Sequence, residues 1–546
     1  MMVAYTKQVP VMTLKQLLSG LCETDYLADI EIKGLALDSR KVDTGYAFIA
    51  LQGQLDHGLA YAEAALNRGA VVVLCDAKFD QYCQQILSKI MTRAICVPIK
   101  NLSAKLGELA ARIYGPAHKD LFIAAVTGTD GKTSVSHFIA QAMHQAHGSA
   151  AFIGTPGNGV LGNGMQGGGL DESTHTTPDI ISLHEMLADY KHRGARHVSM
   201  EVSSHGLDQQ RVAGIDFNVA ILTNLSRDHL DYHGTIEAYK AAKKRLFSEH
   251  AQAAMILNAD DAFGCELYEA FTDLVNVNTA HNIWLYGLEK RALTKNALSS
   301  ARLYAIAEGV KTRHDGMVFM LNSSHGMAQV RVQLMGEFNI YNVLACFCTL
   351  IQSGINFNHA IKYIGNLHTV PGRMELLHEP GKPSVVIDYA HTPQALSQAL
   401  ENARKHVSGK LICVFGCGGD RDRGKRPLMA QGAERLADVL IVTSDNPRNE
   451  DPQDIINDIK AGIGDEAHLL IETDRRKAIL QAIAMADEKD LVLIAGKGHE
   501  NYQLIGNEKI NFNDRLVAEH GLLSYGGQHP PRHFPRHLPR HLPGKQ

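Results

Sequence analysis

Short apolar runs alternate with amphipathic stretches along most of the chain, a pattern that predicts strands separated by helices. In the first 118 residues the pattern predicts strands at 46–51, 71–75 and 95–99 and helices at 61–68 and 103–114. Tyr114-Gly115-Pro116 then predicts a helix stop followed by a linker. We therefore expect residues 1–118 to form a small α/β domain.

The alternation continues over residues 119–363 with strands of the buried type. We expect these strands at 121–126, 197–202, 219–223 and 254–258, and a further β segment at 300–334. Strands that alternate with helices form a parallel sheet that is covered on both faces. This segment is therefore expected to be a central parallel-sheet domain.

Residues 364–525 repeat the same rhythm, with strands at 385–388, 411–415, 439–443 and 491–495 and helices at 394–406, 426–437 and 452–463. This order predicts a Rossmann-like doubly wound domain, in which ligands bind beyond the carboxyl ends of the strands. Residues 526–546 carry a Pro-Arg-His repeat that is incompatible with helix or sheet and predicts a disordered tail. The predicted fold class is thus α/β with three domains.

The turn after the strand at 121–126 carries the clearest chemistry. Residues 127–134 have the sequence Thr-Gly-Thr-Asp-Gly-Lys-Thr-Ser and open a helical stretch. Backbone N–H groups in such a turn, with the positive end of the helix dipole, form a cradle for phosphate. Lys132 would reach the terminal phosphates, and the Thr133 hydroxyl would lie where Mg²⁺ needs a ligand. Because Val126 replaces the early glycine of the usual P-loop, a glycine-rich turn that binds nothing is the alternative.

Four further residues are expected at the same edge of the central sheet. Glu201 ends one strand, which is a usual place for a carboxylate that holds Mg²⁺, and Asn224 and His229 follow the next strand. Lys243 lies in the helix that we expect at 235–247. A lone helical lysine is usually a solvated cation, but phosphate charge needs several fixed partners. The grouping therefore favours a phosphate site.

Two polar loops follow strands of the third segment. One is Gly416–Gly424, which contains Asp420 and Arg421, and the other is Asp445-Asn446-Pro447-Arg448. An acid beside arginines suits a zwitterion, because Asp accepts from an ammonium group and Arg binds a carboxylate with two hydrogen bonds. Charge balance at surface loop tips is the alternative.

Composition narrows the function classes. The formal net charge of -4 argues against a nucleic-acid binder held by bulk charge, and no apolar run is long enough to span a bilayer. The first 20 residues lack a signal-peptide core. The nine cysteines have no metal-ligand spacing, and those in apolar runs are expected to be small buried hydrophobes: Cys346, Cys348, Cys413 and Cys417. We expect no nucleic-acid partner, no membrane insertion and a cytoplasmic location.

The motifs, in this order, resemble those of the Mur ligases, ATP-dependent amide-forming enzymes of peptidoglycan synthesis. The resemblance runs from Leu37 to Leu522, and its longest matching motifs are 201–207, 223–234, 416–427 and 495–500. It implies a UDP-sugar-binding domain, a central ATPase domain and a C-terminal amino-acid-binding domain. It also implies ATP and Mg²⁺ as cofactors, small-molecule substrates, a monomer and a bacterial cytoplasm.

The resemblance assigns the nucleotide and metal sites residue by residue. The ATP side comprises Gly128, Thr129, Asp130, Gly131, Lys132, Thr133, Ser134, Asn224, Asn339, Asn342, Arg373 and Asp388, with the two later asparagines facing adenine. The catalytic set comprises Lys132, Glu201, His229 and Lys243, of which the last three hold the metal together with Thr133. Lys243 matches a lysine that family members carry as a carbamate (N6-carboxylysine), which turns a cation into an anion able to bridge to Mg²⁺.

The resemblance also assigns two substrate sites. The UDP-muramoyl-dipeptide side comprises Leu37, Ser39, Gln54, Leu55, Asp56, His175, Thr176, Thr177, Ser203, Gln209 and Arg211. The amino-acid site comprises Arg421, Asp445, Asn446, Pro447, Arg448, Gly496 and Glu500. Asp-Asn-Pro-Arg at 445–448 is the family's signature for meso-diaminopimelate. An Arg448 aimed at the second carboxylate of diaminopimelate would be left without a partner on lysine, which discriminates strongly.

The implied reaction is phosphorylation of the D-glutamate carboxylate of UDP-N-acetylmuramoyl-L-alanyl-D-glutamate, followed by attack of the diaminopimelate amine on the acyl phosphate. Two alternatives stay open: the same ligase acting on L-lysine or another diamino acid, and a nucleotide-binding scaffold with a defunct site. The chain departs from the family pattern at Asp130 and at His175, where asparagine is common. Asp130 places an extra negative charge beside the triphosphate.

Overall fold

The computed structural model describes residues 12–24, 27–53, 56–77, 81–162, 170–171, 173, 175–250, 252–273, 282–289, 301–464 and 468–526. The chain folds into two compact units. The first unit contains residues 1–309, 319–330 and 338–367, and the second contains 310–318, 331–337 and 368–546. The predicted contacts Gln54 and Leu55 and the predicted tail from residue 527 onward lie outside the described residues.

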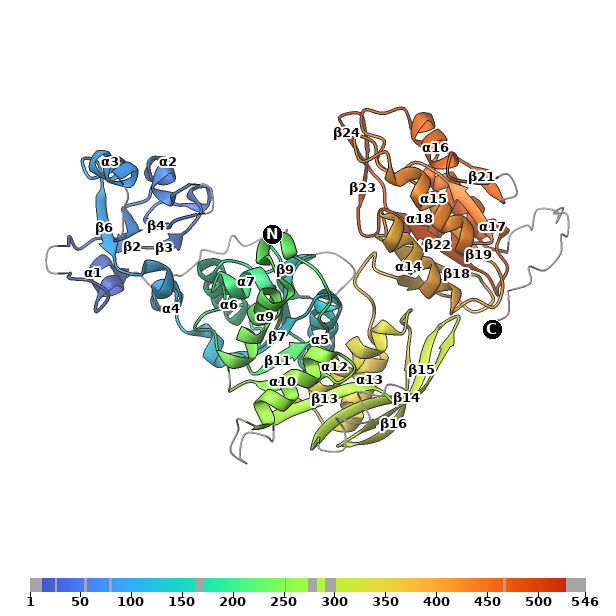
Figure 1. The fold of residues 1–546 in the computed structure, drawn as a ribbon, viewed down its shortest axis with the longest axis horizontal. Helices are drawn as coiled ribbons and strands as arrows, with labels where there is room; N and C mark the ends of the chain where they lie inside the picture. The colour runs from blue at the N-terminus through green and yellow to red at the C-terminus, as the bar shows by residue number, and fades with distance from the viewer. Residues whose placement is uncertain are drawn as a thin grey trace. The chain divides into compact units, whose positions relative to one another are not determined.

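The first unit opens with a four-stranded parallel sheet. Its strands, in spatial order, are β3 (Gly34–Ala36), β4 (Tyr46–Ala50), β5 (Val72–Asp76) and β6 (Ile95–Ile99). One face packs against α2 (Ala62–Asn67) and α3 (Gln81–Ile90), and the other against α1 (Leu14–Leu18) and α4 (Leu106–Tyr114) (Figure 1). A short antiparallel pair is formed by β1 (Met12–Thr13) and β2 (Glu31–Ile32). The three predicted strands are confirmed.

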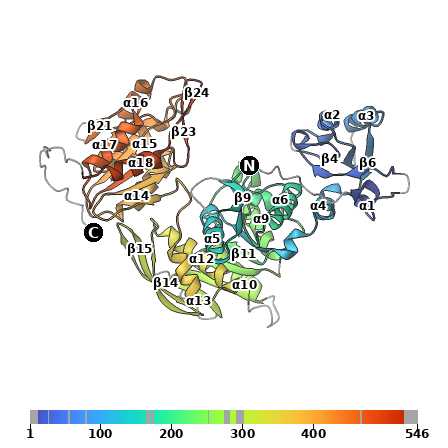
Figure 2. The ribbon, with the colours of Figure 1, turned by 180° about the vertical axis from the view of Figure 1, so that it is seen from behind.

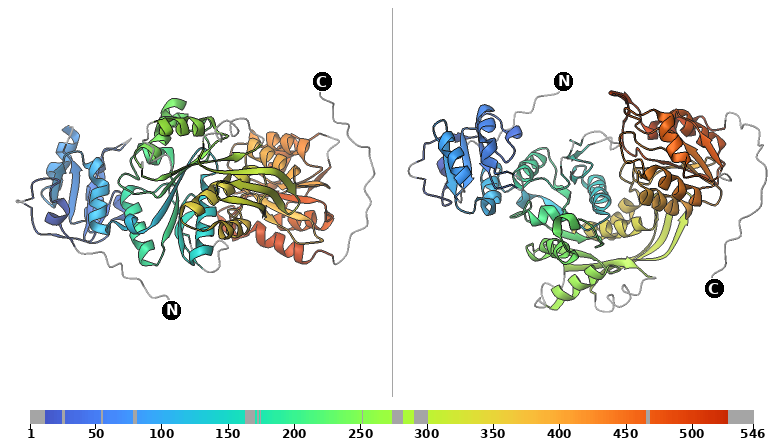
Figure 3. Two further views of the ribbon diagram at one scale, coloured as in Figure 1. Left: turned by 90° about the horizontal axis from the view of Figure 1, so that it is seen from below. Right: turned by 45° about the horizontal axis from the view of Figure 1, so that its top comes forward.

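The central sheet has ten strands in the order β16-β15-β14-β13-β12-β11-β7-β10-β8-β9. In chain order these are β7 (Phe122–Thr127), β8 (Ala150–Gly154), β9 (Gly157–Leu161), β10 (His197–Glu201), β11 (Val219–Leu222), β12 (Ala254–Asn258), β13 (Ile283–Leu288), β14 (Leu303–Arg313), β15 (Gly316–Ser323) and β16 (Gly326–Val332). The long strands β14, β15 and β16, drawn in yellow-green in Figure 3, form the predicted β segment. Because β7 pairs in parallel with both β10 and β11, the carboxyl ends of these three strands lie at one edge.

Helices cover both faces of this sheet. On one face α5 (Lys132–His147) packs against α12 (Phe338–Gln352), as Figure 2 shows. The other face buries α6 (Ile180–His192), α9 (Ile236–Ser248) and α10 (Ala262–Asp273), and α4 packs on α6. Shorter helices are α7 (Ser204–Asp208), α8 (Leu230–His233) and α13 (Phe357–Gly365). Among the described residues, every helix falls short of the length and apolar character needed to cross a membrane.

The second unit is built on a six-stranded sheet. Its strands, in spatial order, are β17 (Glu375–Leu377), β18 (Ser384–Asp388), β22 (Leu491–Ala495), β19 (Leu411–Phe415), β20 (Val439–Val442) and β21 (Leu469–Ile471). All neighbours are parallel except β17, which runs antiparallel to β18. An antiparallel hairpin of β23 (Tyr502–Ile505) and β24 (Glu508–Asn511) follows.

Alternate residues of these buried strands point to opposite faces, as the pleat requires. Leu411, Cys413 and Phe415 face one helical layer, whereas Ile412 and Val414 face the other. The first layer is α14 (Pro393–Arg404), α15 (Lys425–Leu436) and α16 (Pro452–Lys460), and the second is α17 (Arg475–Met485) and α18 (Asp514–Leu523). The predicted doubly wound arrangement is therefore confirmed.

Two details differ from the predicted pattern. The amphipathic pattern after the phosphate-type turn predicts a helix that starts near Val135, but α5 begins at Lys132. The left-handed Gly131 (φ 81°) ends the turn, and the polar residues that follow form the first helical turn. The strands β8 and β13 were not predicted, since apolar runs of five or six residues cannot be distinguished from buried helix by periodicity. The four cysteines predicted to be buried are buried.

Candidate functional site

The turn between β7 and α5 is held in shape by the segment that follows β11. Gly128 has a φ of 152°, and a Cβ atom there would lie 1.8 Å from the Thr223 hydroxyl oxygen, so only glycine fits. The Thr223 hydroxyl donates to the Asp130 carbonyl (2.6 Å), and the Asn224 side-chain carbonyl accepts from the Asp130 N–H (2.9 Å). Asn224 therefore contacts the loop backbone itself.

Two lysine amines converge on one carbonyl of this loop. Lys132 Nζ donates to the carbonyls of Gly128 (2.9 Å) and Thr129 (2.7 Å), and Lys243 Nζ donates to the same Gly128 carbonyl (2.7 Å). Burial, followed by the nearby charge of Lys132, lowers the pKa of Lys243 to about 6. The Lys243 side chain is 1% exposed, so its amine is held largely uncharged at neutral pH. Of the two amines, Lys132 is therefore the one that offers positive charge to an incoming anion.

Glu201, at the end of β10, meets the same loop. Its carboxylate accepts from the Thr155 N–H (2.8 Å) and the Thr155 hydroxyl (3.3 Å), and it is hydrogen-bonded to Thr133. Burial raises the pKa of Glu201, and these hydrogen bonds and Lys132 oppose that shift. Mg²⁺ prefers oxygen ligands, so the Thr133–Glu201 pair fits this ion. Lys243 fits it only as a carbamate, which would present oxygen atoms instead of an amine.

His229 lies farther out, on the loop after β11. It adopts a left-handed conformation (φ 53°) just before α8, and its side chain is 44% exposed. Its ring packs edge-on against His205, with centroids 5.0 Å apart, and lies 3.4 Å from the Asp228 carboxylate. Within the described residues the ring contacts of His229 are with His205 and Tyr239 rather than with Glu201.

The residues expected to hold the muramoyl peptide form a hydrogen-bonded group beside Glu201. The Thr177 hydroxyl donates to the Glu201 carbonyl (3.0 Å) and accepts from the Ser203 N–H (2.9 Å). Arg211 donates to the Thr177 carbonyl (2.8 Å) and also to the side chain of Gln209 (2.6 Å). The Thr176 hydroxyl lies 3.1 Å from that of Thr155, which links this group to the carboxylate, whereas His175 is exposed.

The remaining predicted residues of the first unit fall into two places. Leu37 and Ser39 lie after β3, where Asp38 caps the short turn Ser39–Lys41, and Asp56 is exposed. On α12, Asn342 donates to the side chain of Asn339 (2.9 Å), and both are buried. A Cβ atom at Gly131 would lie 2.9 Å from the Asn342 side-chain oxygen, so these asparagines adjoin the phosphate-type loop.

Arg373 and Asp388 belong to the second unit. Both carboxylate oxygens of Asp388 accept backbone N–H groups, from Met374 (2.8 Å) and Ala390 (2.9 Å), and burial raises the pKa of Asp388. The Arg373 guanidinium lies 5.2 Å from the centre of the Tyr389 ring. In the described structure Asp388 therefore fixes the chain around β18.

The loops expected to hold an amino acid do converge, at the carboxyl ends of β20 and β22. A Cβ atom at Gly496 (φ 119°) would lie 2.6 Å from the Asp445 carboxylate, so glycine permits their close approach. Arg448 is left-handed (φ 50°), its side chain donates to the Gly419 carbonyl (2.8 Å), and its backbone pairs with the hairpin strand β23. Pro447 is buried, and Arg421 is exposed on the neighbouring loop.

Two buried cations beside this site escaped prediction. Arg475 is fully buried, forms a two-pronged ion pair with Asp514 (2.8 and 2.7 Å) and donates to the Ala495 carbonyl (3.0 Å). Lys497 is also fully buried and donates to Glu500 (2.8 Å) and Asn446 (3.0 Å). Lys497 lies inside the motif 495–500, and that position was the one signal that could have pointed to it.

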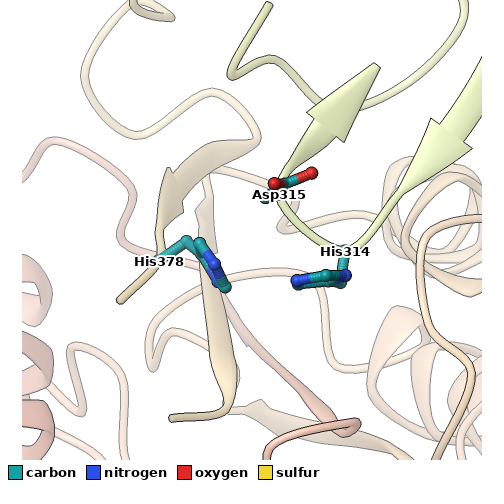
Figure 4. Close-up of side chains that lie close together, drawn as sticks. All are labelled: His314, Asp315 and His378. Atoms are coloured by element: carbon teal, nitrogen blue, oxygen red, sulfur yellow. The ribbon is translucent and has the colours of Figure 1, made fainter. Parts of the chain in front are cut away.

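A second cluster, His314, Asp315 and His378, has ligand-type atoms within 4.8 Å of one another (Figure 4). Its carboxylate already forms ion pairs with Arg331 and Arg313. Two guanidinium groups beside one carboxylate leave no negative charge for a divalent cation. We interpret this cluster as a structural ion-pair group rather than a metal site.

Comparisons with known proteins agree with the geometry. Three family models match in order: the Mur ligase family catalytic domain at residues 31–114, the Mur ligase middle domain at 126–350 and the Mur ligase glutamate ligase domain at 372–498. The chain is 42% identical to the UDP-N-acetylmuramoyl-L-alanyl-D-glutamate–2,6-diaminopimelate ligase of Chromobacterium violaceum over 499 residues, which is 91% of this chain and 95% of that protein. The chain belongs to the Mur ligase family.

Other Mur ligases support the same assignment. The enzyme of the same name from Coxiella burnetii is 41% identical over 495 residues, covering 91% of this chain and 96% of its own. A solved structure of a UDP-N-acetylmuramoyl-L-alanyl-D-glutamate–2,6-diaminopimelate ligase superposes with a TM-score of 0.71 at 37% identity, covering 94% of this chain and 99% of its own. The predicted α/β fold class with three Mur ligase domains is confirmed, while the exact domain bounds stay a prediction.

Asp130, which stands where asparagine is common in Mur ligases, places a negative charge beside the proposed triphosphate site, and the effect of this charge can be tested. Its side chain is exposed at the tip of the loop, while its backbone is held by Thr223 and Asn224. We expect Asp130→Asn to lower the KM for ATP by roughly twofold to fivefold, because an exposed charge interaction is worth about 0.5–1 kcal/mol. Asp216→Asn, at an acid that is 71% exposed on another loop, is the control. An unchanged or higher KM in Asp130→Asn would contradict this account.

Proposed function

We propose that this protein is the ATP-dependent ligase that adds meso-2,6-diaminopimelate to UDP-N-acetylmuramoyl-L-alanyl-D-glutamate. The observation that carries the proposal is the convergence of Lys132 and Lys243 on the Gly128 carbonyl, with Glu201 hydrogen-bonded to Thr133 in the first turn of the helix that follows. That constellation suits phosphoryl transfer, in which positioning and charge stabilisation supply most of the catalysis. The names of relatives that span 91% of this chain supply the substrates.

The first step joins the nucleotide to the D-glutamate side chain. A carboxylate oxygen of the substrate attacks the γ-phosphorus of ATP, the bond to the bridging oxygen breaks, and ADP leaves. Lys132 contacts the phosphate oxygens and offsets the charge that moves during transfer. Bound Mg²⁺ would neutralise the phosphates, and Thr133, Glu201, His229 and Lys243 as its carbamate would hold it.

The second step forms the amide. The diaminopimelate amine attacks the acyl carbon, phosphate leaves with the carbon–oxygen electron pair, and the amine gives up its proton. The amino acid is assigned to Asp445, Asn446, Arg448 and Glu500. The two carboxylates suit its ammonium groups, and the Arg448 guanidinium suits its carboxylate. Arg421, Pro447 and Gly496 complete that loop cluster.

The other substrate contacts form part of the same proposal. The contacts assigned to the UDP group are Leu37, Ser39, Gln54, Leu55 and Asp56. Those assigned to the muramoyl peptide are His175, Thr176, Thr177, Ser203, Gln209 and Arg211. Those assigned to ATP are Asn339, Asn342, Arg373 and Asp388. Thr177 and Arg211 support this assignment because they are already joined beside Glu201. A monomer in the bacterial cytoplasm, with domains at 1–118, 119–363 and 364–525, completes the proposal.

Release of ADP that depends on the added amino acid tests the proposal. We expect turnover with meso-diaminopimelate to exceed turnover with L-lysine by roughly 10²-fold or more, because lysine leaves the half-buried Arg448 without its carboxylate partner. Arg448→Ala is expected to narrow this ratio mainly by losing activity on diaminopimelate. Faster turnover with L-lysine would establish the alternative substrate, and no ADP release with either amino acid would favour a binding scaffold.

A further inference from the structure

Lys497 is a fully buried cation that the proposed reaction does not use. It follows β22, and its ammonium group donates to Glu500 Oε2 (2.8 Å) and Asn446 Oδ1 (3.0 Å). The same group lies 5.5 Å from the centre of the Tyr502 ring, within cation–π range. An ammonium has three donors and no acceptor. The carboxylate oxygen of Glu500, the amide oxygen of Asn446 and the face of the Tyr502 ring therefore account for the three donors of the Lys497 ammonium group. Lys497 thus contacts its protein neighbours rather than a ligand.

The contacts of Lys497 fix the orientation of the Asn446 amide. Asn446 Oδ1 accepts from Lys497 and from the Leu504 N–H (2.9 Å), so that atom must be the oxygen. The amide nitrogen then has to point the other way, and it donates to Glu500 Oε2 (2.9 Å). Asn446 is 3% exposed and has no room to reorient freely. Lys497 and the Leu504 N–H thus together direct the Asn446 amide nitrogen toward Glu500.

Glu500 is left with one carboxylate oxygen for a ligand. In the described part of the chain, both of its hydrogen-bond donors reach Oε2 and none reaches Oε1. The side chain is 17% exposed, so the carboxylate is partly accessible, and Oε2 is already engaged by Lys497 and Asn446. A fixed carboxylate oxygen with a free lone pair suits an ammonium group.

We propose that Lys497 is a positioning residue for amino-acid recognition: it locks Asn446 and Glu500 so that Glu500 Oε1 faces an ammonium group of the incoming diamino acid. The inference rests on the proposed function, since it deepens the assignment of that same site. Lys497 contacts no substrate in this scheme and is not a catalytic residue.

Charge gives the proposal a signature that loss of packing would not produce. Five titratable or charged groups interact electrostatically with Glu500. Lys497 and His499 belong to its own loop, Asp445 to the loop after β20, Arg475 to α17 and Tyr389 to the loop after β18. Burial acts to raise the pKa of Glu500, but the hydrogen bond and charge of Lys497, with smaller contributions from Asn446 and His499, together hold that pKa below its usual range. Without Lys497 the carboxylate should protonate at higher pH, and a protonated Glu500 binds an ammonium poorly.

Steady-state ADP release by the full-length enzyme tests the proposal with Lys497→Met, which keeps the length of the side chain but removes charge and donors. We expect the KM for diaminopimelate to rise roughly tenfold to a hundredfold, since hydrogen bonds to charged groups are lost. The KM values for ATP and for the UDP-dipeptide should stay within twofold of wild type. The acidic limb of kcat/KM for diaminopimelate should move to higher pH.

Lys497→Gln is the second variant, because its amide keeps two N–H donors without the charge, and we expect it to fold even if the buried methionine destabilises the protein. It should shift the acidic limb in the same direction with a smaller rise in KM. Lys382→Met is the matched control, because Lys382 forms an ion pair of the same three-residue spacing with Glu379 (2.5 Å) in the same unit. Lys382→Met should leave all three KM values and the pH profile unchanged.

The proposal is overturned if either folded Lys497 variant keeps the wild-type KM for diaminopimelate and the wild-type pH profile. It is also overturned if all three KM values rise by the same factor, which would indicate general damage to the fold. A wild-type enzyme that releases no ADP with diaminopimelate would instead contradict the proposed function, so the two failures are distinguishable.

Discussion

Replacing Lys243 with alanine is expected to reduce the kcat of amino-acid-dependent ADP release roughly 10²–10³-fold, the range seen when one fixed charge-stabilising group is removed. The amine donates to the Gly128 carbonyl, is buried, and has a pKa lowered to about 6 by burial and by Lys132. An uncharged amine can attack CO₂, forming an N–C bond and releasing a proton, to give the carbamate. The alanine variant loses that anion at the predicted metal position.

Short carboxylic acids separate this role from a structural one. Formate or acetate added to Lys243→Ala should restore part of the activity, because a free carboxylate can occupy the space of the missing carbamate. Lys244→Ala, at the exposed neighbour on the same helix, should behave as wild type with or without added acid. Full activity of Lys243→Ala would remove the carbamate from the mechanism, and a folded variant that no acid restores would assign Lys243 a purely structural role.

Replacing Lys132 with alanine is expected to cause a loss of similar or larger size, roughly 10²–10³-fold in kcat, because phosphoryl transfer depends on charge stabilisation by the loop lysine. Lys132 contacts the carbonyls of Gly128 and Thr129, so its amine already lies at the loop that would hold the phosphates. The measurement is again ADP release at saturating diaminopimelate and UDP-dipeptide.

The two lysine variants should differ in one respect. Carboxylic acids should restore nothing in Lys132→Ala, since the missing group there is a cation rather than an anion. Binding of the UDP-dipeptide should survive, because its proposed contacts at Thr177 and Arg211 lie on other segments. A Lys132→Ala enzyme with full ligase activity would refute the phosphoryl-transfer mechanism, and unchanged UDP-dipeptide binding without any wild-type activity would favour a scaffold.

Local patterns in the sequence were enough for the fold class and for the phosphate-type loop. Apolar strands at 254–258 and 411–415 match β12 and β19 residue for residue, because the short length of each run and the strand–helix alternation around it favour a strand where periodicity alone does not decide. Gly128 and Gly131 were recognisable because glycine is strongly favoured where a tight turn needs positive φ. Most of the assigned site residues, however, came from the resemblance to Mur ligases rather than from pattern alone.

The sequence by itself therefore determined the fold class, most of the elements with their order, and the residue types that follow the predicted strands. Only the tertiary structure decided which of these side chains come into contact with one another. Lys243 is a helical lysine in the sequence, and its pKa is lowered because the fold buries its amine and, to a smaller extent, because α9 places it beside Lys132, 111 positions away along the chain. Lys497 and Asn446 are likewise 51 residues apart, and their hydrogen bond depends on β20 and β22 ending at the same edge of one sheet. Burial, pKa and amide orientation are properties of neighbours in space, and local sequence does not encode them.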